Sequence, residues 1–328
     1  MAKLIMYRDQ IKKIYAKSGA YINHVLTFVL AFLAMLVMGR SIGSDGMISS
    51  PLIALTLALI CSFFPFNVTV IVATLYLVLL LFGLSVELAI IATCIILVIY
   101  LLYFRFAPKT GFILLLTPIL YFIKIPYVIP IVVALTVGVG GIVPTVGGVF
   151  IYYLIDFASS YQTTITTLDA DNALQNIQFI FNNILTSKEL IVVIISFSLV
   201  ITLVYFVKRL SFAYAWPVAI VSGSVIDALI QIIAFLVLSV KYNLPMMLIG
   251  HVVAIAVGIV LNFFCFSVDF SATEIVQFED DDYYYYVKAV PKVTVATEKV
   301  RLKKINEQEM TDGIYTEDYE DEEDTIKF

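Results

Sequence analysis

Residues 111–157 constrain the fold of this chain most, because the stretch is almost wholly apolar and yet repeatedly interrupted. The interruptions are Pro118, Pro126, Pro130, Pro144, Gly138, Gly140, Gly141, Gly147 and Gly148. Broken helices at membrane depth are tolerated only where protein or a water-filled cavity satisfies the freed backbone groups. We therefore expect this stretch in the middle of a multi-helix membrane domain, where it would hold the functional site.

The composition places the chain in a lipid bilayer. Of its 328 residues, 61% are hydrophobic and only 14% are charged, whereas soluble domains are about 25% charged. Several apolar runs approach the roughly 20 residues that cross a hydrocarbon core of about 30 Å. The sequence therefore predicts an all-α polytopic membrane protein, a bundle of about eight or nine membrane segments.

The charges separate a membrane domain from an acidic tail. Residues 1–268 carry 13 Lys/Arg and 8 Asp/Glu, whereas residues 269–328 carry 7 and 17. We expect a basic N-terminus, a transmembrane domain, a small strand-rich segment and a disordered acidic end. Their predicted bounds are 1–20, 21–268, 269–305 and 306–328. The acidity of the tail argues against binding nucleic acid or anionic lipid surfaces, which attract Lys and Arg.

Clusters of basic residues predict the orientation, because Lys and Arg accumulate on the cytoplasmic side of membrane proteins. They lie in the N-terminus, at Arg105 and Lys109, at Lys208 and Arg209, and between 288 and 304. The long apolar runs that connect them are 22–39, 85–104, 190–207, 213–239 and 246–268. We expect both termini in the cytoplasm and the protein in the cell membrane. Low charge and frequent Ile, Tyr and Asn are typical of a bacterial chain.

Two apolar stretches are too long for one membrane-spanning helix and too short for two full ones. Residues 51–82 break at Phe64-Pro65-Phe66-Asn67, and residues 111–137 break at Lys124-Ile125-Pro126-Tyr127. Each is a re-entrant hairpin or a pair of short spans. The breaks superimpose at an offset of 61 residues, and the pairs would open from opposite sides. This pattern indicates an inverted repeat, which in transporters brackets a site at the midplane. The alternative is that any two proline-broken apolar hairpins look alike.

Two segments follow the second pair. A Gly/Pro segment leads into a short apolar run over 146–157, and the polar residues 158–188 predict an outside loop. Within this loop, apolar residues at helical spacing follow Asp171, which suits an N-cap, and predict an amphipathic helix on the outer interface. These residues are Leu174, Ile177, Phe181 and Ile184.

Asp227 is the strongest candidate for chemistry, because an ionisable group inside an apolar span is costly and marks a functional site by default. Ser224 and Gln231 lie three residues before and four residues after it, so the three side chains share one helix face. This face suits a proton or cation relay. The alternative is a structural clamp, with Asp227 protonated or paired with Lys124 or a hydroxyl.

The other candidates depend on their depth in the membrane. Lys124 pairs with Asp227 if the second hairpin is re-entrant, and reaches the outer interface if the hairpin spans. Counting along the helices places His251 about 10 Å from the level of Asp227, so we expect no direct Asp–His pair. We interpret His251 as a helix–helix hydrogen bond. Pro126, Gly140, Gly141 and Pro144 complete the predicted path, where the glycines allow close packing or expose carbonyls to a substrate.

The spacing of apolar residues in the acidic tail differs from that in the membrane domain. KVTVATEKVRL alternates apolar and polar residues, and four tyrosines run from Tyr283 to Tyr286. This pattern predicts a β-hairpin or small sheet that turns near Pro291.

The motifs of common enzymes are missing from the sequence, which has no HExxH, GxSxG or Walker pattern. Two histidines and three dispersed cysteines offer no metal spacing, so we expect no enzyme, cofactor or metal. The sequence favours a transporter-like or channel-like protein that moves a small solute or ion through a site between the two broken pairs. The alternative is a non-transporting scaffold that recruits a cytoplasmic partner through residues 270–328.

Overall fold

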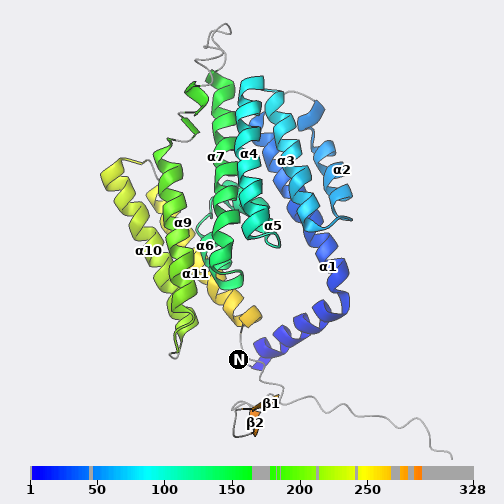
Figure 1. Cartoon of the computed structure of the whole chain (residues 1–328), viewed down its shortest axis with the longest axis vertical. Coiled ribbons are helices and arrows are strands. Elements are labelled where there is room, and N and C mark those ends of the chain that lie inside the picture. Colours follow the sequence, from blue (N-terminus) through cyan, green and yellow to red (C-terminus); the bar gives the residue numbers. More distant parts are fainter. Residues whose placement is uncertain are drawn as a thin grey trace, which may run out of the picture. The chain divides into compact units, whose positions relative to one another are not determined.

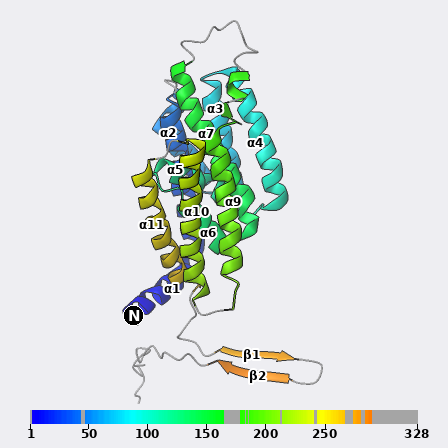
Figure 2. The ribbon, with the colours of Figure 1, turned by 90° about the vertical axis from the view of Figure 1, so that its left-hand side faces the viewer.

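The computed structural model divides the chain into two units, Met1–Ser267 and Val268–Phe328, called here the membrane unit and the tail unit. The structure describes residues 2–43, 47–164, 178–181, 183–184, 186–211, 214–240, 243–266, 274–279 and 284–289. Helices build the described part of the membrane unit, and two strands build that of the tail unit (Figures 1 and 2).

Six helices in the described part of the chain are long and apolar enough to cross a membrane. They are α1 (Ala2–Ile42), α4 (Val86–Phe106), α7 (Ile142–Thr164), α9 (Lys188–Val207), α10 (Ala215–Leu238) and α11 (Leu244–Leu261). In α1 the apolar part begins at Tyr21, just after a kink at Ser18. Short polar residues cap several of these helices, among them Ser85 before α4 and Ser187 before α9. The chain is thus an integral membrane protein with several membrane passes.

Four shorter helices form the two broken pairs. They are α2 (Pro51–Cys61) with α3 (Phe66–Phe82), and α5 (Gly111–Phe122) with α6 (Val128–Thr136). Both breaks lie at the predicted prolines, and the last residues of α2 and α5 are 61 positions apart, as the offset requires. The predicted total of eight or nine segments stays a prediction, because these helices are shorter than a full span.

The tip of the first pair lies beside the start of the apolar part of α1 and the end of α4. Ser62 donates a hydrogen bond from its hydroxyl to the carbonyl of His24 at 2.9 Å. Asn67 accepts one at 2.9 Å from the hydroxyl of Tyr103, near the last turn of α4. The pair α2–α3 therefore reaches the level at which its neighbouring long helices begin and end.

The second pair points the opposite way. Along α5, Leu114 lies against Gly147 and Thr117 against Gly148, and further on Tyr121 stacks on Tyr152 at 4.2 Å. This order shows that α5 runs parallel to α7, so its tip lies toward the later turns of α7. The two tips therefore point to opposite ends of the membrane unit, and a site between both pairs stays a prediction.

α7 also differs from the prediction. It begins at Ile142 and continues to Thr164. It is therefore longer than the predicted run over 146–157, and it extends into the first residues of the predicted loop over 158–188. Pro144 does not break it, because in the first turn of a helix the missing N–H would have no intrahelical partner anyway. Gly148 sits inside the helix where α5 approaches closely, since an added Cβ would lie 2.5 Å from Thr117.

Two hydrophobic cores meet at α7, which stands between α4 and α9 in Figure 1. The first core is built by α1 to α5 with one side of α7, including Ile151 and Ile155. The second is built by α6 and α9 to α11, with Val149 from the other side of α7. α5 also contributes to both cores.

The predicted amphipathic helix is described only in part. Residues 178–181 and 183–184 are helical, with Ile180 and Ile184 buried and Phe181 exposed. The buried face of this segment therefore contains Ile180 and Ile184, whereas Phe181, which the sequence places on the same face, lies outside it. Asp171, Leu174 and Ile177 lie outside the described residues.

The tail unit contains an antiparallel hairpin of β1 (Glu274–Glu279) and β2 (Tyr284–Ala289). Its register pairs Glu274 with Ala289 at one end and Glu279 with Tyr284 at the other. The predicted turn near Pro291 lies outside the described residues and stays a prediction. Residues 290–328, including the predicted disordered end, lie outside the described residues.

Candidate functional site

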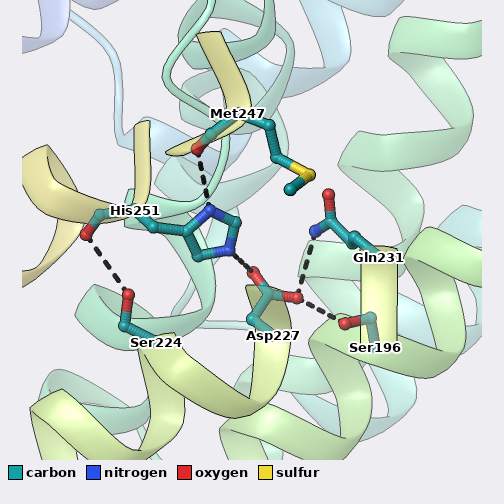
Figure 3. Close-up of polar contacts among 6 residues, drawn as sticks. All are labelled: Ser196, Ser224, Asp227, Gln231, Met247 and His251. Carbon is teal, nitrogen blue, oxygen red and sulfur yellow. Dashed lines mark hydrogen bonds and ion pairs between the residues drawn. The ribbon is translucent and has the colours of Figure 1, made fainter. Parts of the chain in front are cut away.

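Asp227 lies in the middle of α10 with only 1% of its surface exposed. Ser196 of α9 donates a short hydrogen bond to Asp227 Oδ1, and Gln231 Nε2 donates to the same oxygen at 3.2 Å (Figure 3). Ser224 shares the helix face, as predicted, but donates to the carbonyl of His251 at 3.2 Å. Asp227 Oδ1 thus accepts two hydrogen bonds, whereas Asp227 Oδ2 faces a different residue.

That partner is His251, whose Nε2 lies 3.3 Å from Asp227 Oδ2. Its Nδ1 lies 2.8 Å from the carbonyl oxygen of Met247, and a carbonyl only accepts, so Nδ1 carries a proton. A neutral ring would then present a bare Nε2 to a carboxylate, and two acceptors would face each other. A proton on either Nε2 or Oδ2 would let these two atoms form a hydrogen bond.

The prediction that Asp227 and His251 do not pair is wrong. It assumed that α10 and α11 end and begin at the same level. At the end of α10, Ser239 takes a left-handed conformation with φ 55°, and Val240 N lies 3.5 Å from the carbonyl of Ala234. The chain therefore turns back toward α10 at Val240, and α11 begins at Leu244, two residues before the predicted start, so His251 lies closer to the level of Asp227 than the prediction allowed.

A cavity of about 230 Å³ lies beside this pair, between the tip of the second broken pair and α7, α9, α10 and α11. Its lining is Tyr121, Lys124, Pro126, Tyr127, Tyr152, Tyr153, Asp156, Glu189, Val193, Gln231, Asn243, Met246 and Met247. Lys124 and Asp156 are exposed at its mouth, while Tyr121 and Gln231 are buried, with 8% and 0% exposure. The cavity therefore joins a charged mouth to a polar floor.

Two buried atoms at the floor have no hydrogen-bond partner among the described residues, Tyr121 Oη and Gln231 Oε1. Buried polar atoms are nearly always satisfied. Because Gln231 directs its amide nitrogen to Asp227, its oxygen points elsewhere (Figure 3). The floor thus offers an acceptor at Gln231 Oε1 and, at Tyr121, a hydroxyl that can donate or accept, to a molecule in the cavity.

Lys124 does not pair with Asp227, whose polar side-chain partners are Ser196, Gln231 and His251. It lines the mouth of the cavity and interacts electrostatically with Asp156 of α7. Of the two predicted positions for Lys124, the structure supports the one at the surface.

The predicted path residues fall into two groups. Pro126 lines the cavity with Lys124 and Gln231. Gly140, Gly141 and Pro144 lie at the start of α7, at the other end of that helix from Asp156. Gly141 packs against Val133 and Val137 rather than against a cavity.

The sequence did not reveal the acidic and aromatic residues that line the cavity. Tyr152 and Asp156 are four residues apart on α7, which places them on one helix face, and this spacing was the available signal. It was hidden because Asp156 lies close to the predicted exit of a short run. Glu189 gave no signal, since it stands at the start of an ordinary apolar span.

No protein-family model, curated protein or solved structure matches this chain.

Proposed function

We propose that this protein moves a small polar solute or ion across the membrane, and that the Asp227–His251 pair carries a proton in each cycle. The observation that supports the proposal most is the position of this buried pair directly behind the polar cavity. Ionisable groups inside membrane domains are expensive to bury and mark substrate or proton pathways.

Three cavity-lining residues also contact the pair. Gln231 bonds to Asp227 at 3.2 Å, Tyr127 stacks on His251 with ring centroids 4.1 Å apart, and the carbonyl of Met247 lies 2.8 Å from the His251 ring. A molecule that binds at the floor would shift these residues, and with them the ease of removing the proton from the pair. Such linkage is reciprocal, so the protonation of the pair would change the affinity for the molecule.

The proposal predicts that Asp227→Asn abolishes proton flux. The purified protein would be reconstituted in liposomes with an internal pH dye, and flux would be followed under an imposed pH gradient and membrane potential. Asparagine keeps the size of the side chain but cannot exchange a proton. Ser222→Ala is the matched control, because Ser222 lies on α10 and bonds only to the carbonyl of Ala219 in its own helix.

Flux in the wild type and in Ser222→Ala that falls to the level of empty liposomes in Asp227→Asn would support the proposal. Absence of flux in all three, with Asp227→Asn changing only the melting temperature, would make Asp227 a structural clamp.

A further inference from the structure

The mouth of the cavity carries a positive and a negative side chain that form no ion pair with each other. Lys124 and Asp156 line the same cavity and interact electrostatically. No ion pair within 4.0 Å joins these two described residues, although both line the cavity. A gap of this kind suits a ligand that carries both charges itself.

The backbone at Lys124 supports a role for its side chain. Lys124 has φ 67°, and the next residue closes α5 with a bond from Ile125 N to the carbonyl of Leu120 at 3.0 Å. Glycine is the usual residue at such a helix end, because other side chains are strained there. A lysine held in a strained conformation at the mouth of a cavity points to a function for its ammonium group.

Gln231, at the floor of the cavity, needs a hydrogen-bond donor. Gln231 Oε1 is fully buried without a partner, and its amide nitrogen is already engaged by Asp227. An ammonium group supplies such a donor, and the stacked rings of Tyr121 and Tyr152 provide aromatic faces that attract a cation. A carboxylate would find only acceptors at Gln231 Oε1 and Asp156.

We propose that the cavity binds a small zwitterion of the size of an α-amino acid, with its carboxylate on Lys124 and its ammonium toward Gln231 and Asp156. This inference rests on the proposed function and names its substrate class. A simple cation would leave Lys124 without a carboxylate from the ligand, and a simple anion would be repelled by Asp156 and Glu189 and would bring no donor to Gln231. A ligand with both groups complements Lys124 with its carboxylate and Gln231 and the acidic side chains with its ammonium.

The test measures binding to the purified full-length protein by thermal shift and by equilibrium dialysis with labelled probes. Three probes are compared: a mixture of the common L-amino acids, a mixture of short alkylamines, and a mixture of short carboxylates. The variants are Lys124→Gly, which removes the charge and relieves the backbone, and Asp156→Asn at an exposed position. Lys188→Gln is the control, because Lys188 is an exposed lysine of α9 outside the cavity lining.

We expect the amino-acid mixture to bind and both other mixtures to fail. Lys124→Gly and Asp156→Asn should each weaken binding roughly tenfold to a hundredfold, as the loss of a charge-assisted hydrogen bond does. Lys188→Gln should bind like the wild type, and unliganded Lys124→Gly should melt no lower than the wild type.

Binding of amines or carboxylates alone, or unchanged binding in Lys124→Gly, would overturn the zwitterion and leave the proposed function in place. Failure of all probes would also overturn it. If the flux measured for Asp227 were absent as well, the proposed function would fail with it.

Discussion

At the scale of single residues, the two ends of α6 depend on unusual backbone conformations. Lys124 precedes the helix with φ 67°, and Gly138 follows it with φ 80° and ψ −152°. The conformation of Gly138 belongs to a region that is essentially restricted to glycine. An added Cβ there would also lie 2.7 Å from the ring of Tyr205. The glycine therefore serves the path of the chain, not the exposure of carbonyls to a substrate.

This geometry predicts that Gly138→Ala lowers the free energy of unfolding by about 1–3 kcal/mol from backbone strain alone. The clash with Tyr205 adds to this cost. Gly140→Ala is the matched control, because nothing lies within 4 Å of a Cβ at that position. Chemical unfolding in detergent measures both variants. Equal losses in the two would contradict the assignment of strain to Gly138.

At the scale of elements, α6 is held at its far end by a side chain of another helix. Lys208, just after α9, donates to the carbonyls of Ala134 and Leu135 at 2.6 Å and 3.0 Å. The last carbonyls of a helix have no intrahelical donor, and a cation there also complements the helix dipole. Burial, and secondarily the neighbouring Arg209, lower the pKa of Lys208.

Lys208→Met should therefore destabilise the membrane unit by roughly 1.5–3 kcal/mol at neutral pH, because the two carbonyls lose a charged donor. The lowered pKa adds a pH dependence. Between the lowered pKa and the ordinary lysine value, the unfolded chain binds the proton more tightly, so the wild type gains stability as pH rises. Melting temperatures of wild type and Lys208→Met from neutral to alkaline pH measure this. A constant difference between them across that window would contradict it.

The elements also show what the sequence could predict. Both breaks lie at predicted prolines, Pro65 and Pro126, whereas Pro118 and Pro130 lie inside α5 and α6 without ending them. The pairing of Asp227 with His251 does not follow, because it depends on how far the chain folds back at Ser239. A sequence gives the level of a residue along its own helix, but packing sets the offset, tilt and rotation between helices. The cavity draws on five segments, so those offsets determine its lining.

At the scale of the whole molecule, the chain consists of a membrane unit and a tail unit. Every described residue of the candidate site lies in the membrane unit. The tail unit holds a hairpin in which Phe278 pairs with Tyr285. The division between the units separates the two functions considered for the chain, because transport would need the first unit and recruitment of a partner would need the second.

Deletion of residues 268–328 should leave the melting temperature of the membrane unit and its proton flux unchanged. The reason is that neither the two hydrophobic cores nor the described site includes a tail residue. Flux in liposomes and thermal unfolding compare the truncated and full-length proteins. A protein that folds without its tail but loses its cellular role would instead favour the scaffold.

α7 belongs to both hydrophobic cores, with Ile151 and Ile155 in one and Val149 in the other. α5 belongs to both cores as well, so any rotation of one core against the other must pivot on α5 together with α7. Tyr152 and Asp156, which line the cavity, are carried on the same helix. A small roll of α9 to α11 about α7 would widen or narrow the cavity mouth while the first core stayed still. A helix that couples the two halves mechanically thus also sets the aperture of the site.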